Sequence, residues 1–343
     1  MASVPNWQAW LQRQWQLPTP QLSVQLLRPL SWLYAALTAV RRAVYRLGLR
    51  RPIAAPCPVI VVGNLMVGGA GKTPTVIALV RWLRSQGHVP GVVSRGHGRT
   101  GVGLVGVTRS SQAQLVGDEP LLIHLRTGAP VVVGPDRTAA AARLCADHAA
   151  VTVIVADDGL QHLRLARCVE VWLFDDRGAG NGLLLPAGPL RERLPQSTGP
   201  RCLVLYRAGR STHLPGYLGT RRLSGVLPLE TWWADPSAAP QPLSALWGRS
   251  VLAVAGLARP EAFFAMLEAQ GLQIRRRPMP DHHDYAALPW TASDDEVIVT
   301  EKDAVKLRPE RIGTTRVWVA RLDFEPEPAF GIALSNLLAQ PTT

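Results

Sequence analysis

A glycine-rich turn that follows a short apolar run constrains this chain more than any other feature. The run V-I-V-V at residues 59–62 is rich in β-branched side chains, which favours a buried parallel strand. The turn behind it contains Gly68, Gly69 and Gly71. Glycines let the backbone aim several N–H groups at one point, and the positive end of a following helix strengthens that field. The segment therefore predicts a site for anionic phosphate groups.

The two residues after this turn carry the prediction further. Lys72 would reach the terminal phosphates of a nucleotide as a compact positive charge, and the Thr73 hydroxyl would bind a magnesium ion. The usual phosphate-loop pattern has a glycine five positions before Gly71, where this chain has Met66. A flexible glycine turn is the alternative, but the order of strand, Gly-Lys-Thr and helix favours nucleotide binding.

Length and cysteine content limit the class of protein. A chain of 343 residues is long enough for two domains, because single cores stop growing at roughly 250 to 300 residues. The four cysteines include no C-x-x-C pair, which argues against a zinc site and against a disulfide framework. Such a chain suits the reducing cytosol.

Charge is distributed unevenly along the chain, whose formal net charge is +12. Residues 1–117 contain 13 Lys and Arg and no Asp or Glu, whereas the remaining residues contain 24 Lys and Arg against 25 Asp and Glu. The whole positive excess therefore lies in the first third of the chain. This asymmetry predicts an anionic partner, either a nucleic acid or a membrane surface.

An uncharged segment lies inside this basic region. Residues 29–40 read P-L-S-W-L-Y-A-A-L-T-A-V, with Arg28 before them and five arginines between positions 41 and 51. A helix that spans a membrane needs about 20 apolar residues, so the segment is short for that purpose. Aromatic residues near its ends and arginines beyond them favour a helix that lies on an anionic membrane. An ordinary packed first helix is the alternative.

Helices and strands alternate after the phosphate loop, which predicts a doubly wound parallel sheet. We expect its strands at residues 89–93, 131–133, 151–156, 169–174 and 202–206. The many Gly and Pro residues at 178–195 predict a long functional loop, and residues 208–249 also have the composition of a loop.

A second α/β unit is expected after this segment. Its predicted strands cover residues 251–255, 272–276, 297–300 and 316–320, and its predicted helices cover 260–270 and 327–338. The predicted organisation is thus an N-terminal membrane-associated helical segment (1–55), a P-loop NTPase-like nucleotide-binding α/β domain (56–210) and a smaller α/β domain (211–343).

Two aspartates follow the predicted strand at 151–156. Asp157 and Asp158 would hold magnesium beside Thr73, directly or through water. A pair of aspartates at the end of a strand is also often a cap or a turn. With the phosphate loop present, magnesium binding is the better interpretation.

Further candidates for the reaction lie elsewhere in the chain. Asp118, the first acid of the sequence, could accept a proton from a substrate hydroxyl or could cap a helix. The stretch D-H-H-D at 281–284 could tune such a base, bind a metal or form a polar loop. Arg191, within the loop at 178–195, could contact phosphate or lie in solvent.

Seven ordered motifs between positions 59 and 306 together carry a resemblance. They read G-N-L-M-V-G-G-A-G-K-T-P, V-S-R-G-H-G-R, G-D-E-P, A-D-D-G-L-Q-H, L-P-A-G-P-L-R-E, P-D-H-H-D-Y and T-E-K-D-A-V-K. In this order they resemble the tetraacyldisaccharide 4'-kinases, the lipid A kinases of Gram-negative bacteria. The N-terminal stretch L-L-R-P-L-S-W-L-Y looks like the membrane helix of that family.

The resemblance implies an activity and a location. The activity is transfer of the γ-phosphate of ATP, with Mg²⁺, to the 4'-hydroxyl of a tetraacylated glucosamine disaccharide 1-phosphate, which yields lipid IVA. The location is the cytoplasmic face of the inner membrane, with peripheral or monotopic attachment. The expected partners are the acylated disaccharide phosphate lipid and the anionic membrane surface, without nucleic acid and without an obligate protein partner.

The resemblance also implies roles for individual residues. Catalysis would involve Asp118 as the base, His282 as its partner with His283 as the alternative, Lys72 and Asp158. The nucleotide would be bound by Gly68, Gly69, Gly71, Lys72, Thr73 and Arg191, and the metal by Thr73, Asp157 and Asp158. The chain departs from the usual S-R-G-Y-G of the family, because His97 replaces the tyrosine.

Three other classes of function fit the residues less well. A GTPase or nucleotide-dependent switch generally selects guanine with N-K-x-D, and the nearest run here, T-E-K-D, has the wrong spacing because Lys302 and Asp303 are adjacent. A membrane-bound nucleotide sensor would need no catalytic base. A nucleic-acid-binding protein would fit the charge, but the basic region contains an apolar segment and no recognisable nucleic-acid module.

Overall fold

The computed structural model describes residues 7–17, 19–68 and 71–340, and the chain packs into two compact units. Unit one comprises the described residues up to Lys72, the segment Asp158–Thr220 and the residues from Pro326 on. Unit two comprises Thr73–Asp157 and Arg221–Glu325. Each unit therefore contains segments that are far apart in the sequence.

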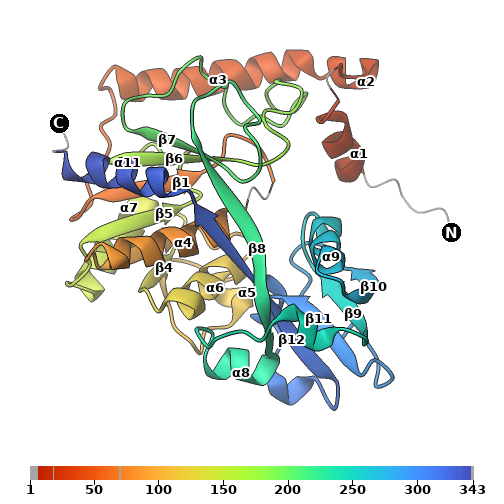
Figure 1. Cartoon of the computed structure of the whole chain (residues 1–343). Helices are drawn as coiled ribbons and strands as arrows, with labels where there is room; N and C mark the ends of the chain where they lie inside the picture. The colour runs from red at the N-terminus through yellow and green to blue at the C-terminus, as the bar shows by residue number, and fades with distance from the viewer. Residues whose placement is uncertain (1–6, 18, 69–70, 341–343) are drawn as a thin grey trace. The chain divides into compact units, whose positions relative to one another are not determined.

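Unit one is built on a parallel sheet. Its strands are β1 (Val59–Gly63), β6 (Val169–Phe174), β7 (Cys202–Tyr206) and the first residues of β8 (Tyr217–Pro228), in the order β8-β7-β6-β1. All five residues of β1 are buried, as its β-branched run predicted. The C-terminal helix α11 (Pro328–Ala339) packs on β6 and β7 (Figure 1).

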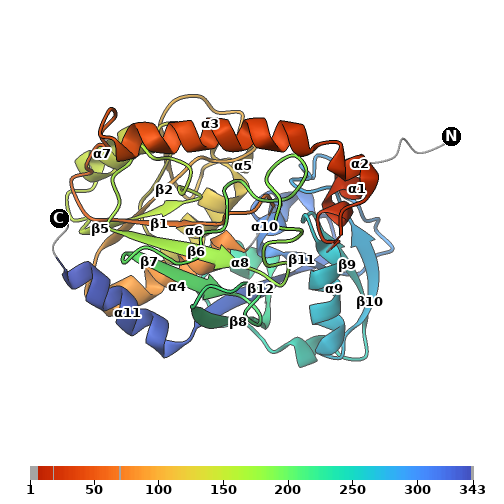
Figure 2. The ribbon, with the colours of Figure 1, turned by 90° about the horizontal axis from the view of Figure 1, so that it is seen from above.

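Three N-terminal helices also belong to unit one, namely α1 (Trp7–Gln14), α2 (Leu22–Gln25) and α3 (Arg28–Arg46). Figure 2 shows α3 as one long uninterrupted helix. It is fastened to the loop at 178–195, because the Ser31 hydroxyl donates to the Leu184 carbonyl at 2.9 Å and the Tyr34 hydroxyl to the Arg191 carbonyl at 3.0 Å. The same side of α3 packs on a small apolar cluster around Met66.

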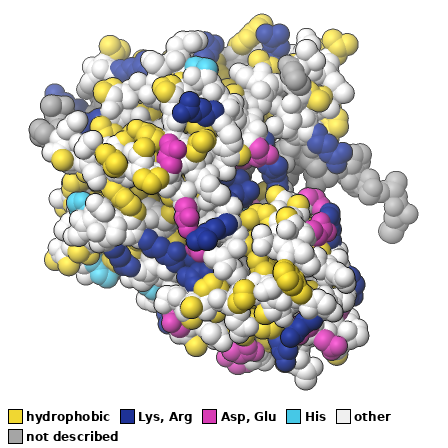
Figure 3. Space-filling model, viewed as in Figure 1, with side chains coloured by type: hydrophobic (Ala, Val, Ile, Leu, Met, Phe, Trp, Pro, Cys, Tyr) yellow, Lys and Arg dark blue, Asp and Glu magenta, His cyan; other side chains and the backbone are white. Residues whose placement is uncertain are grey.

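The opposite side of α3 is exposed. Its exposed apolar side chains are Leu30, Trp32, Leu33, Leu37 and Val40, of which Trp32 keeps 63% of its surface accessible. Along the α3 edge in Figure 3, hydrophobic and arginine side chains are interspersed. Among the described helices, none combines the length and the apolar character that crossing a membrane requires.

Unit two contains two groups of strands. The first has the order β5-β2-β4-β3, in which β5 (Val153–Asp157), β2 (Pro90–Ser94) and β4 (Val131–Val133) are parallel and β3 (Val105–Val107) is antiparallel. Its helices are α4 (Lys72–Ser85), which begins at the last residue of unit one, α5 (Ala113–Val116), α6 (Asp118–Thr127) and α7 (Arg137–Asp147). Helix α7 packs on β2 and β4.

The second group of strands in unit two has the parallel order β10-β9-β11-β12. These strands are β9 (Ser250–Ala255), β10 (Gln273–Pro278), β11 (Glu296–Thr300) and β12 (Arg316–Pro326). The helical segments are α8 (Leu229–Ala234), α9 (Pro260–Ala269) and α10 (Glu301–Ala304), with 3₁₀ turns at Leu243–Leu246 and Pro309–Arg311. Phe263, Phe264 and Leu267 of α9 enter the apolar core beneath β9 and β11.

The doubly wound parallel fold is thus confirmed, and one local prediction was wrong. Residues 208–249 do not form one long loop, because β8 and α8 lie within them. The strand β8 could not be recognised from its sequence, because it contains Arg and Gly residues in place of an apolar run. Its pairing also depends on other segments of the chain. The expected division into segments 1–55, 56–210 and 211–343 stays a prediction.

Candidate active site

The glycine-rich turn in unit one has the backbone that its glycines were predicted to allow. Gly68 has φ +100° and Gly71 has φ +72°, values that residues with a side chain rarely adopt. The Asn64 side-chain amide donates to the Gly68 carbonyl at 3.1 Å and ties the start of the turn to its glycines. Gly69, which was also predicted to bind phosphate, lies outside the described residues.

Lys72 begins helix α4 directly after this turn, and its ammonium lies close to one predicted metal ligand. The distance from Lys72 Nζ to Asp158 Oδ1 is 3.6 Å. Arg191 approaches the same carboxylate, with 3.2 Å between its terminal nitrogen and Asp158 Oδ1. Unit one therefore brings three predicted site residues together as a carboxylate between two cations.

Thr73 and Asp157 are both buried in unit two. Asp157 is the last residue of β5, and its Oδ2 accepts a hydrogen bond from the Ser94 hydroxyl at the end of β2, at 3.0 Å. A buried carboxylate at the carboxyl end of a parallel strand and a hydroxyl in the first turn of a helix are the hard oxygen ligands that Mg²⁺ prefers.

These two residues fit a magnesium ion that takes its remaining ligands from water and nucleotide phosphates. In the described part of the chain, no group of three or more His, Cys, Asp and Glu side chains could hold a metal by itself.

Asp118 in unit two is held by two donors rather than used as a helix cap. It is the first residue of α6, and Gly117, with φ +95°, occupies the cap position. His282 Nδ1 lies 3.1 Å from Asp118 Oδ2, and Lys306 Nζ lies 3.2 Å from the same oxygen. Burial by itself would raise the pKa of Asp118, but the His282 hydrogen bond and the Lys306 charge outweigh it and lower that pKa.

The geometry around the two histidines differs. His282 has a left-handed backbone conformation, with φ +61°. Its Nδ1 lies within hydrogen-bond distance of Asp118, and its Nε2 lies 3.4 Å from the Lys302 ammonium. The ring of His283 instead packs edge-on against Tyr285, with 4.9 Å between ring centroids. This arrangement favours His282 over His283 as the partner of Asp118. His97 lies beside His282, with 5.7 Å between their ring centroids.

Sequence reasoning assigned no role at this site to two lysines. Lys306 touches Asp118, and Lys302 bonds to Asp281 at 2.9 Å. Burial lowers the pKa of Lys302, but the carboxylates of Glu119 and Asp281 outweigh that effect and raise it. One signal was available, because Lys72, Lys302 and Lys306 are the only lysines among 37 basic residues. All three lie within 4 Å of a carboxylate oxygen.

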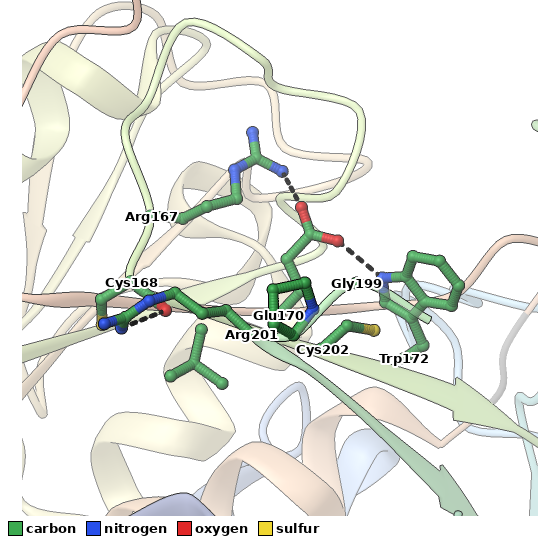
Figure 4. A pocket seen from close by; sticks show the side chains of 9 residues that line it. Arg167, Cys168, Glu170, Trp172, Gly199, Arg201 and Cys202 are labelled. Carbon is green, nitrogen blue, oxygen red and sulfur yellow. Dashed lines mark hydrogen bonds and ion pairs between the residues drawn. The ribbon is translucent and has the colours of Figure 1, made fainter. Parts of the chain in front are cut away.

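A pocket of about 320 Å³ in unit one contains none of the predicted site residues. Figure 4 shows Arg167, Glu170 and Trp172 at its wall, joined by hydrogen bonds. Its residues lie at the amino ends of β6 and β7, whereas open parallel sheets bind ligands at the carboxyl ends. Burial raises the pKa of the Cys168 and Cys202 thiols that line it, so both are poor nucleophiles.

Comparison with known proteins agrees with the motifs. Residues 23–339 match the family model LpxK, tetraacyldisaccharide-1-P 4'-kinase. A tetraacyldisaccharide 4'-kinase of Methylibium petroleiphilum is 56% identical over 339 residues, covering 97% of this chain and 94% of the relative. One of Leptothrix cholodnii is 51% identical over 319 residues, covering 91% and 90%.

A solved structure supports the same assignment. The crystal structure of LpxK from Aquifex aeolicus in complex with ATP matches with a TM-score of 0.76 and 26% identity. The match covers 92% of this chain and 100% of that one. This chain therefore belongs to the LpxK family of tetraacyldisaccharide-1-P 4'-kinases and is an ATP-dependent lipid A kinase.

Proposed function

We propose that this chain transfers the γ-phosphate of ATP to the 4'-hydroxyl of a tetraacyldisaccharide 1-phosphate, with Asp118 as the proton acceptor. The observation that carries the proposal is the buried Asp118 carboxylate, which His282 and Lys306 hold at the start of α6. Phosphoryl transfer needs little covalent chemistry from the protein beyond positioning, charge and one proton acceptor. An ionised, oriented carboxylate meets the last of these needs.

The proposed reaction proceeds in one transfer. The O–H bond of the acceptor breaks as its proton passes to Asp118, an O–P bond forms to the γ-phosphorus, and the bond to the β-phosphate oxygen breaks to release ADP. His282 orients the carboxylate through its Nδ1–H. General-base groups of this kind typically contribute about 10²- to 10⁴-fold in rate.

The nucleotide is proposed to lie on the glycine-rich turn. Backbone N–H groups around Gly68, Gly69 and Gly71 would bind its phosphates, and Lys72 would reach the terminal ones as a point charge. Lys72 is already paired with Asp158, which Arg191 also contacts. We infer that an incoming phosphate exchanges with Asp158 for these two cations, which would place Arg191 on the nucleotide.

Magnesium is proposed to bind Thr73, Asp157 and Asp158. When bound, the ion neutralises charge on the phosphates and stabilises the charge that develops as the terminal phosphate is transferred. Two observations support Thr73 and Asp157 as ligands. Both side chains are buried, and the Ser94 hydroxyl donates a hydrogen bond to Asp157, so the oxygen atoms are held in place. Release of Asp158 from Lys72 would free the third.

The enzyme is proposed to work on the cytoplasmic face of the inner membrane, attached through α3. The exposed apolar side chains of α3 and the arginines at positions 41–51 support this attachment. An acylated acceptor lies in a membrane, and ATP is supplied on its cytoplasmic side. Peripheral or monotopic attachment would give the kinase access to both.

The test is transfer of ³²P from the γ-position of ATP to a tetraacyldisaccharide 1-phosphate in detergent micelles. Wild type should give a singly phosphorylated product. Asp118→Asn should lose at least about 10²-fold in kcat and still bind ATP, whereas Lys72→Ala should lose both transfer and ATP affinity. Binding of ATP or GTP without transfer by the wild type would instead support a nucleotide-dependent switch.

A further inference from the structure

The Lys306 ammonium is enclosed in unit two by groups from three segments. Its side chain keeps only 3% of its surface accessible. Asp118 at the start of α6 lies 3.2 Å from Lys306 Nζ, and Asp303 Oδ1 lies 3.6 Å from it. The ring of Tyr285 supports the ammonium from another side, with 5.3 Å to the ring centroid. A buried lysine held in this way has little freedom to move.

The second carboxylate beside Lys306 is itself fixed. Asp303 is fully buried and accepts hydrogen bonds from the Thr300 hydroxyl at 2.7 Å and from the Gly256 backbone N–H at 3.1 Å. The Lys306 backbone N–H in turn donates to the Asp303 carbonyl at 3.0 Å. Asp303 therefore holds the Lys306 side chain in place, with its ammonium next to the Asp118 carboxylate.

The two donors to Asp118 use the same oxygen. His282 Nδ1 and Lys306 Nζ both lie within 3.2 Å of Oδ2, and within the described residues Oδ1 accepts no hydrogen bond. A carboxylate fixed in this way has one oxygen engaged and the other available for a substrate hydroxyl. The charged or titratable groups around it are His282, Lys306, Lys302, Asp303, Glu119, Asp281, Tyr285 and His97.

We propose that Lys306 is a positioning residue of the phosphotransfer reaction, whose ammonium keeps Asp118 ionised and turns its Oδ1 toward the acceptor hydroxyl. The inference rests on the proposed role of Asp118 as proton acceptor. A protonated Asp118 could not accept a second proton at that oxygen, so the ammonium preserves activity as the pH falls. The lowered pKa of Asp118 agrees with this arrangement.

The first experiment measures kcat/KM for the acceptor lipid between pH 3 and pH 9 in wild type and Lys306→Met, because the lowered pKa of Asp118 places the acidic limb below pH 5. Removing the positive charge raises the pKa of Asp118, since burial then acts with less opposition. The acidic limb of the profile, where kcat/KM falls as the pH is lowered, should move to a pH about one unit higher. On that limb, kcat/KM of Lys306→Met should be about tenfold below the wild-type value, and the difference should shrink toward pH 9. ATP affinity should stay at the wild-type value.

Two further variants keep the test decisive if Lys306→Met does not fold. Lys306→Arg keeps the charge, so its acidic limb should stay at the wild-type pH even if the larger side chain lowers kcat. Lys306→Met combined with Asp303→Asn removes the anchored charge pair together, so it leaves no uncompensated charge at Asp303. This double variant should show the same displaced limb as Lys306→Met.

A uniform loss at every pH in both methionine variants, with ATP still bound, would overturn the role of Lys306. Asp118→Asn separates that result from a failure of the proposed function. If Asp118→Asn is inactive and the limb does not move, only the Lys306 inference is wrong. If Asp118→Asn keeps wild-type transfer, the role of Asp118 is wrong, and the Lys306 inference is wrong with it.

Discussion

The Arg126 guanidinium is fully buried in unit two and is neutralised by two carboxylates. It pairs with Glu301, the first residue of α10, and lies 2.5 Å from Asp323 on β12. Burial lowers the pKa of Arg126, but these carboxylates outweigh it and raise that pKa. Because Arg126 is in the last turn of α6, the pair joins the helix that presents Asp118 to the segment that precedes Lys306.

Replacing Arg126 by methionine should destabilise the protein strongly. The change leaves the buried Glu301 carboxylate without its cation, which typically costs about 3–5 kcal/mol, whereas the half-buried Asp323 keeps Arg81 at 3.2 Å. Urea unfolding of the full chain, followed by tryptophan fluorescence, measures the effect. Arg276→Met is the matched control, because Arg276 pairs with two glutamates on the exposed surface and should change the midpoint little. Equal midpoints for both variants would refute the argument.

At the scale of elements, α3 has two sides with different surroundings. Ser31 and Tyr34 fasten one side to the loop at 178–195, while Leu33 and Leu37 stand on the exposed side. Isolated exposed apolar residues are common, but a row at helical spacing beside arginines is typical of a helix that lies in a membrane surface.

The double substitution Leu33→Glu with Leu37→Glu should therefore weaken membrane binding without unfolding the protein. It removes apolar contact and adds two negative charges that an anionic surface repels. Co-sedimentation with vesicles containing anionic phospholipid measures the bound fraction, which should fall several-fold. Ile332→Glu, on an exposed position of α11, is the control and should bind as wild type does. Unchanged binding of the double variant would exclude α3 as the attachment.

At the scale of the whole molecule, the excess of positive charge concerns only part of the chain. The net charge of +12 comes from residues 1–117, which contain no acid, while the remaining residues nearly balance. Such a distribution attracts an anionic surface over distances of about a Debye length, roughly 10 Å at 0.1 M salt.

Association of wild type with anionic vesicles should therefore depend on salt. Raising the salt from about 0.1 M to about 1 M shortens the Debye length to roughly 3 Å, so the bound fraction should fall several-fold. Vesicles of zwitterionic lipid should bind less protein at low salt and should show little salt dependence. Binding that is equal on both kinds of vesicle at every salt concentration would contradict an electrostatic contribution.

Local sequence patterns determined much of this protein. The predicted strands at 169–174 and 202–206 coincide with β6 and β7, because a short apolar run between turn residues needs a buried strand whatever lies beside it. The glycine-rich turn before Lys72 was predictable for the same reason, since positive φ angles at Gly68 and Gly71 are a local requirement. Family motifs added the candidate residues.

Only the tertiary structure decided which of these residues meet. Asp118 is 164 residues from His282 and 188 residues from Lys306, so no local pattern could indicate that both donors share one oxygen of its carboxylate. The same holds for β8, which reads as a loop but becomes a strand beside β7 and β12. Backbone conformation and burial follow from neighbours in the sequence, whereas ion pairs and strand pairing depend on packing between distant segments.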